Sequence, residues 1–134
     1  MRANKIHRRK TKGVGLVESI VMAIVLIPVT LFFLDLIVLV LANSINDSAC
    51  KNAARVAANQ KTIEDAAPAA EKAVAAYSKN SIIRSLKLLT IDYDEANHTN
   101  VKVTTQLKVH MPIPFPGYSD FTFLARDVEP ILVK

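Results

Sequence analysis

The feature that most constrains this chain is an apolar block near the N-terminus, from Ile20 to Leu41. Of its 22 residues, 17 are Leu, Ile, Val or Phe. A helix of this length rises about 33 Å at about 1.5 Å per residue, and the hydrocarbon core of a bilayer is about 30 Å thick. A block of this length and composition predicts a transmembrane helix, because secretory signal sequences have much shorter apolar regions.

Two residues inside the block are unusual for a membrane helix. Pro28 lacks a backbone N–H, so we expect it to kink the helix or loosen one turn. Asp35 costs about 2.5–3.5 kcal/mol near the bilayer centre. Because each large apolar residue contributes about −0.3 to −0.6 kcal/mol, insertion remains favourable. Two positions for Asp35 stay open: the side chain reaches the interface or water, or it makes a polar contact with another helix.

Positive charge is concentrated ahead of the apolar block. Six of the 17 basic residues lie in the first 12 positions, which hold no acidic residue, and the rest of the chain has 11 basic and 12 acidic residues. Basic residues mark the cytoplasmic flank of a membrane helix. We therefore expect a cytoplasmic N-terminus and an extracytoplasmic C-terminal region. The high pI of about 9.5 comes from this leader, so no nucleic-acid partner is expected.

The leader ends in a motif of two residues at a fixed spacing. A basic run ends at Gly13, and Glu18 follows five residues later, just before the apolar block. Glycine leaves the backbone unhindered for a protease, because it has no Cβ. Glu18 is costly at the membrane edge and therefore requires a partner. One interpretation is cleavage between Gly13 and Val14. The other is an uncleaved signal anchor in which this glycine and glutamate occur by chance.

Helical spacing continues beyond the apolar block. The first helix is predicted to run unbroken from about Gly15 to Ala58, with a stripe of smaller residues at Ile45, Ala49, Ala53 and Val56. Such a stripe allows close approach of neighbouring helices, and it equally suits packing on the chain's own domain. A second helix is predicted with Asp65 as its N-cap and Pro68 in its first turn. Its expected buried residues are Ala66, Ala69, Ala70, Ala73 and Tyr77.

The last third of the chain has the period of β-strands. Leu89, Ile91 and Tyr93 alternate with Leu88, Thr90, Asp92 and Asp94, and apolar residues alternate with polar ones from Val101 to Val109. This pattern predicts an antiparallel hairpin with one dry face. The run from Met111 to Gly117 contains three prolines and predicts an extended loop, not a central strand. A last strand is expected near Phe121 to Val128.

These elements predict an α+β fold: a long N-terminal transmembrane helix that continues into an extracytoplasmic helical region, followed by a small antiparallel sheet. The expected divisions are a leader over residues 1–13, the membrane helix and its extension over 14–60, and an extracytoplasmic domain over 61–134.

Catalytic chemistry has little support in the sequence. Cys50 is the only cysteine, so no disulfide can form within the chain, and an alanine-rich helix suits it as a small residue. No nucleophile–base or metal-ligand spacing emerges around His98 or His110. Asp92, Asp94 and Glu95 are interpreted as a solvated hairpin end. We therefore expect a protein without enzymatic activity, cofactor or metal.

The chain resembles the TadE-like minor pilins of the tight-adherence (Tad) pilus system, over nearly its whole length. The resemblance rests on Gly13 with Glu18, on an apolar helix containing Pro28 and a late acid, Asp35, and on the alanine-rich stretch after it. It also includes the proline-rich break before the last strand. In the major Tad pilins the chain is much shorter, so the length favours a minor subunit.

The resemblance implies a pilin-like fold and a place in the bacterial inner membrane, with one span and possible incorporation into a pilus. It implies cleavage after Gly13 by a prepilin peptidase, an assembly role for Glu18, and partners among other pilins and Tad assembly proteins in a hetero-oligomer. Two alternatives remain open. The chain is a pseudopilin of another type IV pilus or type II secretion-like system, or it is a membrane-anchored binding protein with a single span and no assembly role.

Overall fold

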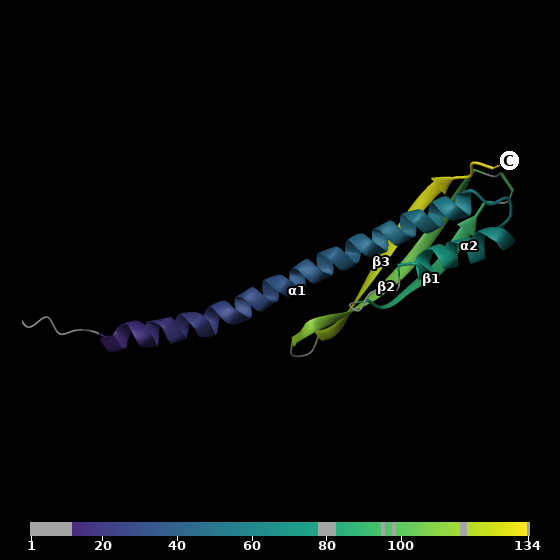
Figure 1. The fold of residues 1–134 in the computed structure, drawn as a ribbon. Helices are drawn as coiled ribbons and strands as arrows, with labels where there is room; N and C mark the ends of the chain where they lie inside the picture. Colours follow the sequence, from purple (N-terminus) through teal and green to yellow (C-terminus); the bar gives the residue numbers. More distant parts are fainter. Residues whose placement is uncertain (1–11, 78–82, 95, 98, 116–117, 134) are drawn as a thin grey trace, which may run out of the picture. The chain divides into compact units, whose positions relative to one another are not determined.

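The structure is a computed structural model that describes residues 12–77, 83–94, 96–97, 99–115 and 118–133. Figure 1 shows a long helix α1 (Lys12–Ala58) and a second helix α2 (Ile63–Ala75). The strands β1 (Ile83–Tyr93), β2 (Asn100–Phe115) and β3 (Tyr118–Pro130) follow in sequence. The α+β class and the antiparallel sheet expected from the sequence are confirmed.

The chain divides into two compact units, which we call the N-terminal unit (Met1–Leu34) and the C-terminal unit (Asp35–Lys134). Every α1 side chain from Gly15 to Leu34 is exposed. Only 6% of the most apolar window of α1 is buried, and the helix is long and apolar enough to cross a membrane. Most of these side chains are large and apolar, and they are exposed in the structure.

Helix α1 continues through Pro28 without a break. The proline removes the backbone N–H that would have bonded to the carbonyl of Ile24. Two residues further on, the Thr30 hydroxyl donates to the Leu26 carbonyl over 2.8 Å. Side-chain donors of this kind satisfy backbone groups inside a helix when water is absent.

The three strands form one sheet in the order β1-β2-β3, and both neighbouring pairs are antiparallel. The predicted dry face of β2 is confirmed, because its inward side chains have no exposed surface: Val101, Val103, Thr105, Leu107 and Val109. Against this face packs the second half of α1, through small residues that include Ala49, Cys50, Ala53, Ala54 and Ala57. Small side chains on the helix allow the sheet to approach closely.

The predicted alternation in β1 is wrong at Leu89. Leu88 pairs with Thr105 and Thr90 pairs with Thr104, so Leu89 is the extra residue of a β-bulge. It is 48% exposed, whereas Tyr93 is buried at 6%. A bulge adds one residue to the strand, so the alternation of inward and outward side chains shifts by one residue after it. Leu86 before the bulge and Tyr93 after it are therefore both buried.

The loop expected from Met111 to Gly117 is largely a strand. β2 continues to Phe115, and Phe115 pairs with Tyr118 at the start of β3. The pairing of β1 with β2 ends at Val109, so Pro112 and Pro114 lie beyond the three-stranded part. Prolines are tolerated there because one side of β2 has no strand partner to donate to. Pro116 and Gly117 lie outside the described residues. β3 is also longer than the predicted 121–128.

Helix α2 begins earlier than predicted, and its N-cap is Thr62 and not Asp65. The Thr62 side chain accepts a hydrogen bond from the backbone N–H of Asp65, and Thr62 has the extended conformation of a cap. Pro68 is consequently the sixth helical residue and lies beyond the first turn, contrary to the prediction. Ala66, Ala70 and Val74 are buried in this helix, whereas Tyr77 is only partly so. Ala69 and Ala73 are also only partly buried.

Candidate functional site

The predicted leader motif lies in the first turns of α1. Gly13 and Val14 are helical in backbone, but their side chains lie outside the described parts. The Glu18 side chain is exposed, and it has no hydrogen bond or ion pair with any residue that the structure describes. Within one helix, residues 14 and 18 are about 6 Å apart along the axis, from about 1.5 Å per residue. Any partner of Glu18 must therefore come from the leader, the lipid headgroups or another molecule.

Gly15 provides a useful comparison within the same motif. A Cβ built at Gly15 would meet no atom within 4 Å, so this position has room for a side chain. Nothing in the packing of the described chain therefore requires glycine at residue 15.

Asp35 is the first buried residue of α1 in the stretch from Gly15 onward, where burial is described. Its exposed fraction is 2%, and neither carboxylate oxygen has a hydrogen-bond partner among the described residues. The structure therefore does not place this carboxylate in water, which was one of the two expectations. A buried polar group without a hydrogen-bond partner is destabilising by about 1–3 kcal/mol in the general case. A contact with another helix remains a prediction.

A buried polar cluster between α1 and the sheet was not predicted. Asn46 is fully buried, accepts a hydrogen bond from the Thr105 hydroxyl over 2.9 Å, and donates to the Phe123 carbonyl over 3.4 Å. The Cys50 thiol, one turn further along α1, is buried and lies 3.4 Å from the Val103 carbonyl oxygen. The only sequence signal was Thr105, the one polar member of the dry face of β2. The cluster fixes the register of α1 on β2.

The exposed charges form small structural networks. Asp120 receives a hydrogen bond from Arg84 at 2.8 Å, and its other oxygen lies 2.9 Å from Nδ1 of His110. The hydrogen bond with His110, with Arg84 second, lowers the pKa of the Asp120 carboxyl below its usual range. These three residues link all three strands near the point where β1 pairing ends.

The acidic cluster at the β1–β2 turn is also structural. Asp94 accepts hydrogen bonds from the Thr99 hydroxyl and from the backbone N–H of Asn97, and these bonds lower the pKa of its carboxyl. Asp94 therefore closes its own turn. Glu95 lies outside the described residues. Among those residues, no group of three or more His, Cys, Asp or Glu side chains could hold a metal ion.

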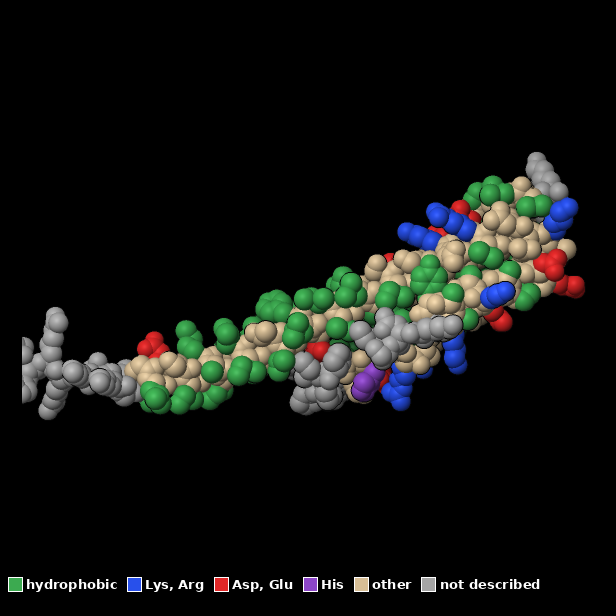
Figure 2. Space-filling model, viewed as in Figure 1, with side chains coloured by type: hydrophobic (Ala, Val, Ile, Leu, Met, Phe, Trp, Pro, Cys, Tyr) green, Lys and Arg blue, Asp and Glu red, His purple; other side chains and the backbone are tan. Residues whose placement is uncertain are grey.

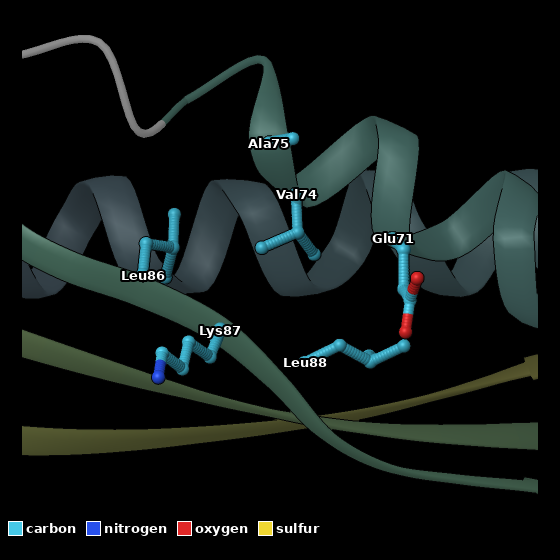
Figure 3. Close-up of a pocket in the computed structure, with 6 residues that line it drawn as sticks. All are labelled: Glu71, Val74, Ala75, Leu86, Lys87 and Leu88. Atoms are coloured by element: carbon cyan, nitrogen blue, oxygen red, sulfur yellow. The ribbon is translucent and has the colours of Figure 1, made fainter.

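A groove lies between α2 and β1, and its lining is mostly apolar. Figure 3 shows Val74 on α2 above Leu86 and Leu88 on β1, with the Glu71 carboxylate pointing toward Leu88 and Lys87 pointing away from α2. Its lining has one carboxylate and one amine but no hydroxyl, thiol or imidazole. An amine can act as a nucleophile and a carboxylate as a general base, but the Lys87 and Glu71 side chains point in different directions, so the lining does not pair the two.

The surface itself separates into two kinds. In the view of Figure 2, hydrophobic side chains follow the exposed part of α1, whereas most Lys, Arg, Asp and Glu side chains lie on the C-terminal unit.

No family model matches this chain, and neither a curated protein nor a solved structure does so. The candidate site is therefore the start of α1, where an apolar helix carries one exposed carboxylate without a described partner.

Proposed function

We propose that this chain is a minor pilin, a structural subunit or assembly factor of a Tad-type adhesion pilus in the bacterial inner membrane. The observation that carries the proposal is the start of α1. There, Gly13 precedes Glu18 by five residues, and an exposed apolar helix follows. A prepilin peptidase would cut between Gly13 and Val14 and leave Glu18 as the fifth residue of the mature subunit.

The two units of the chain suit such a subunit. A helix with large exposed apolar side chains over residues 15–34 can lie in lipid before assembly and against neighbouring helices afterwards. The C-terminal unit holds its own core and can fold on the extracytoplasmic side. The six basic residues of the leader favour a cytoplasmic N-terminus.

The chemistry of the cut supplies the missing partner of Glu18. Cleavage creates a cationic α-amino group on Val14, whose ordinary pKa is about 7.7–8.0. This positive charge is unfavourable at the N-terminus of a helix, because the helix dipole is positive there. A Glu18 carboxylate from a neighbouring subunit would neutralise this amine, and the amine would in turn give that carboxylate its partner. Since Val14 and Glu18 differ by about 6 Å in height, a neighbour shifted by that rise brings its Val14 amine to this Glu18.

The intact mass of the protein extracted from membranes tests the proposed cleavage. We expect a chain that begins at Val14, and Gly13→Leu should leave the leader uncut, while Gly13→Ala should be cut in part. Gly15→Ala is the matched control, because that position has open space, and it should be cut normally. A wild-type chain that still begins at Met1 or Arg2 would favour the membrane-anchored binding protein instead.

A further inference from the structure

An open apolar groove lies between α1 and the edge strand β3. Its lining residues are Leu39, Val40, Asn43, Phe121 and Phe123. All five belong to the C-terminal unit, and Asn43 is the only polar one. Both phenylalanines are partly exposed, and Val40 is 70% exposed. In water, such a surface would be costly, because it combines two aromatic rings with two aliphatic side chains.

The exposed apolar surface of α1 is longer than a hydrocarbon core. Large exposed apolar side chains extend from Leu16 to Leu41, which is 26 residues counted inclusively. At about 1.5 Å per residue they cover about 39 Å, whereas the hydrocarbon core is about 30 Å thick and the whole bilayer about 40–45 Å. Part of this surface must therefore lie outside the core, among the headgroups.

The burial pattern indicates which part that is. Side chains are exposed from Gly15 to Leu34, and Asp35 is the first one buried. A helix covered by its own chain cannot be surrounded by lipid on every side, so the segment 15–34 is the better fit to the core. Its 20 residues rise about 30 Å. Leu36, Ile37, Val40 and Leu41, which are all exposed, then follow at the depth of the headgroups.

We propose that this groove is a membrane contact, in which Leu39, Val40, Phe121 and Phe123 pack against lipid of the outer leaflet at the boundary between the headgroups and the tops of the acyl chains. The inference rests on the proposed membrane anchoring. The groove shares Leu39 and Val40 with the apolar surface of α1, so it continues the lipid-facing surface of the helix. Asn43 follows Val40 by about 4.5 Å along the helix, where a polar residue suits the headgroup region. The edge of the sheet is thereby held at the membrane surface.

Single tryptophans test this contact in the full-length chain, because the natural sequence has none. The Phe123→Trp and Phe121→Trp variants are each reconstituted in vesicles of phosphatidylethanolamine and phosphatidylglycerol. The two substitutions give independent quenching measurements from the same strand. Part of the lipid is brominated near the top of the acyl chains. We expect this lipid to quench both groove tryptophans, and aqueous iodide to quench them weakly.

Two further variants serve as controls. Leu132 is 71% exposed and lies beside the end of α1, because its backbone N–H bonds to the Ala58 carbonyl. In the Leu132→Trp variant, iodide and not lipid should quench the tryptophan. Leu26 is 65% exposed within the segment 15–34. In the Leu26→Trp variant, lipid brominated deep in the acyl chain should quench the tryptophan.

The outcomes separate the two proposals. If lipid quenches Leu26→Trp but neither groove variant, the chain is anchored and the groove contact is wrong. Shielding of the groove tryptophans from both quenchers, lost as the lipid-to-protein ratio rises, would assign the groove to a second copy and overturn the lipid contact. If lipid does not quench even Leu26→Trp, the membrane anchoring in the proposed function fails too.

Discussion

The two halves of α1 solve opposite problems with one continuous helix. From Gly15 to Leu34 the side chains are exposed and most are large and apolar, whereas from Asp35 onward the inward face is made mostly of alanine and is buried. Large side chains suit a helix whose cover is lipid or another subunit. Small side chains suit a helix that the chain's own sheet must approach closely. Side-chain size, more than apolarity, therefore distinguishes the exposed half from the core-forming half.

The acidic residues differ between the halves in the same way. Glu18 is exposed on an apolar surface without a partner in the described chain, whereas Asp47 is exposed on the polar side of the second half. Water solvates Asp47 but is scarce around Glu18 in a membrane. The comparison predicts that function depends on the first of these carboxylates and not on the second.

The largest expected effect comes from Glu18→Ala. If Glu18 pairs with the Val14 amine of a neighbour, its loss leaves that buried amine uncompensated, which costs about 3–5 kcal/mol per broken pair. We expect loss of pili and of pilus-dependent adhesion, with membrane insertion and cleavage largely retained. Electron microscopy and an adhesion assay measure the first two, and intact mass measures cleavage.

Asp47→Ala is the matched control for Glu18→Ala, because it removes an exposed carboxylate from the other half of the same helix. It should leave pili and adhesion normal. Normal pili in the Glu18→Ala strain would show that this carboxylate only lies among the headgroups, and equal defects in both strains would remove the distinction between the halves.

The second prediction contrasts an added side chain in the two halves. Ala53 has no exposed surface, so Ala53→Leu overpacks the contact of α1 with the sheet and should lower stability by about 1–3 kcal/mol. Ala23 is exposed, so Ala23→Leu should change stability little. Thermal loss of β-structure, followed by circular dichroism in detergent, measures both. Equal effects of the two substitutions would mean that the core does not lie where the structure has it.

Much of this contrast could be predicted from the sequence, because periodicity records which face of an element is dry. The alternation from Val101 to Val109 predicted the buried face of β2. The stripe predicted from Ile45 to Val56 gave only part of the inward side of α1, because Ala49 and Ala53 are buried whereas Ile45 and Val56 are partly exposed. The Leu89 bulge could not be predicted, since a single extra residue has no compositional signal. The same holds for the pairing of Phe115 with Tyr118, because it depends on the place where β1 ends.

The candidate site divides in the same manner. Gly13 and Glu18 could be identified as candidates from the sequence because the proposed motif is defined by their spacing along the chain. Asn46 was missed because its meaning is a distant contact with Thr105, 59 residues away. The burial of Asp35 also depends on tertiary contacts. The sequence pattern placed Asp35 in the membrane span but could not predict whether its carboxylate is buried or reaches water.

The third prediction concerns Asp35, the residue at the boundary between the units. Its buried oxygens have no hydrogen-bond partner in the described chain, so Asp35→Leu replaces an unsatisfied carboxylate with an apolar side chain of the same branching. We expect the C-terminal unit to become more stable by about 1–2 kcal/mol. Asp47→Leu, at an exposed position, should have a smaller effect. The unfolding midpoint of each variant in detergent measures the change, and destabilisation by Asp35→Leu would indicate that a partner or water satisfies this carboxylate.

The smallest expected effect is a pH dependence confined to the C-terminal unit. The pKa of the Asp120 carboxyl is lowered in the folded chain, first by its hydrogen bond with His110 and then by Arg84. A lowered folded pKa means that the contribution to stability is complete above the unfolded pKa of about 3.9, and that it is lost as the pH falls through the folded value. Because the group is exposed, solvent screens the contribution, and it is small.

Asp120→Asn should therefore reduce stability slightly at neutral pH and make the unfolding midpoint fall less steeply below about pH 4. Some acid sensitivity should remain, because the lowered pKa of Asp94 acts in the same direction. Asp92→Asn is the matched control, since Asp92 is exposed on the same sheet and forms no ion pair among the described residues. Thermal melts across the acid range compare the three proteins. If Asp120→Asn and wild type have the same acid slope, the network of Arg84, His110 and Asp120 does not hold the three strands together in solution.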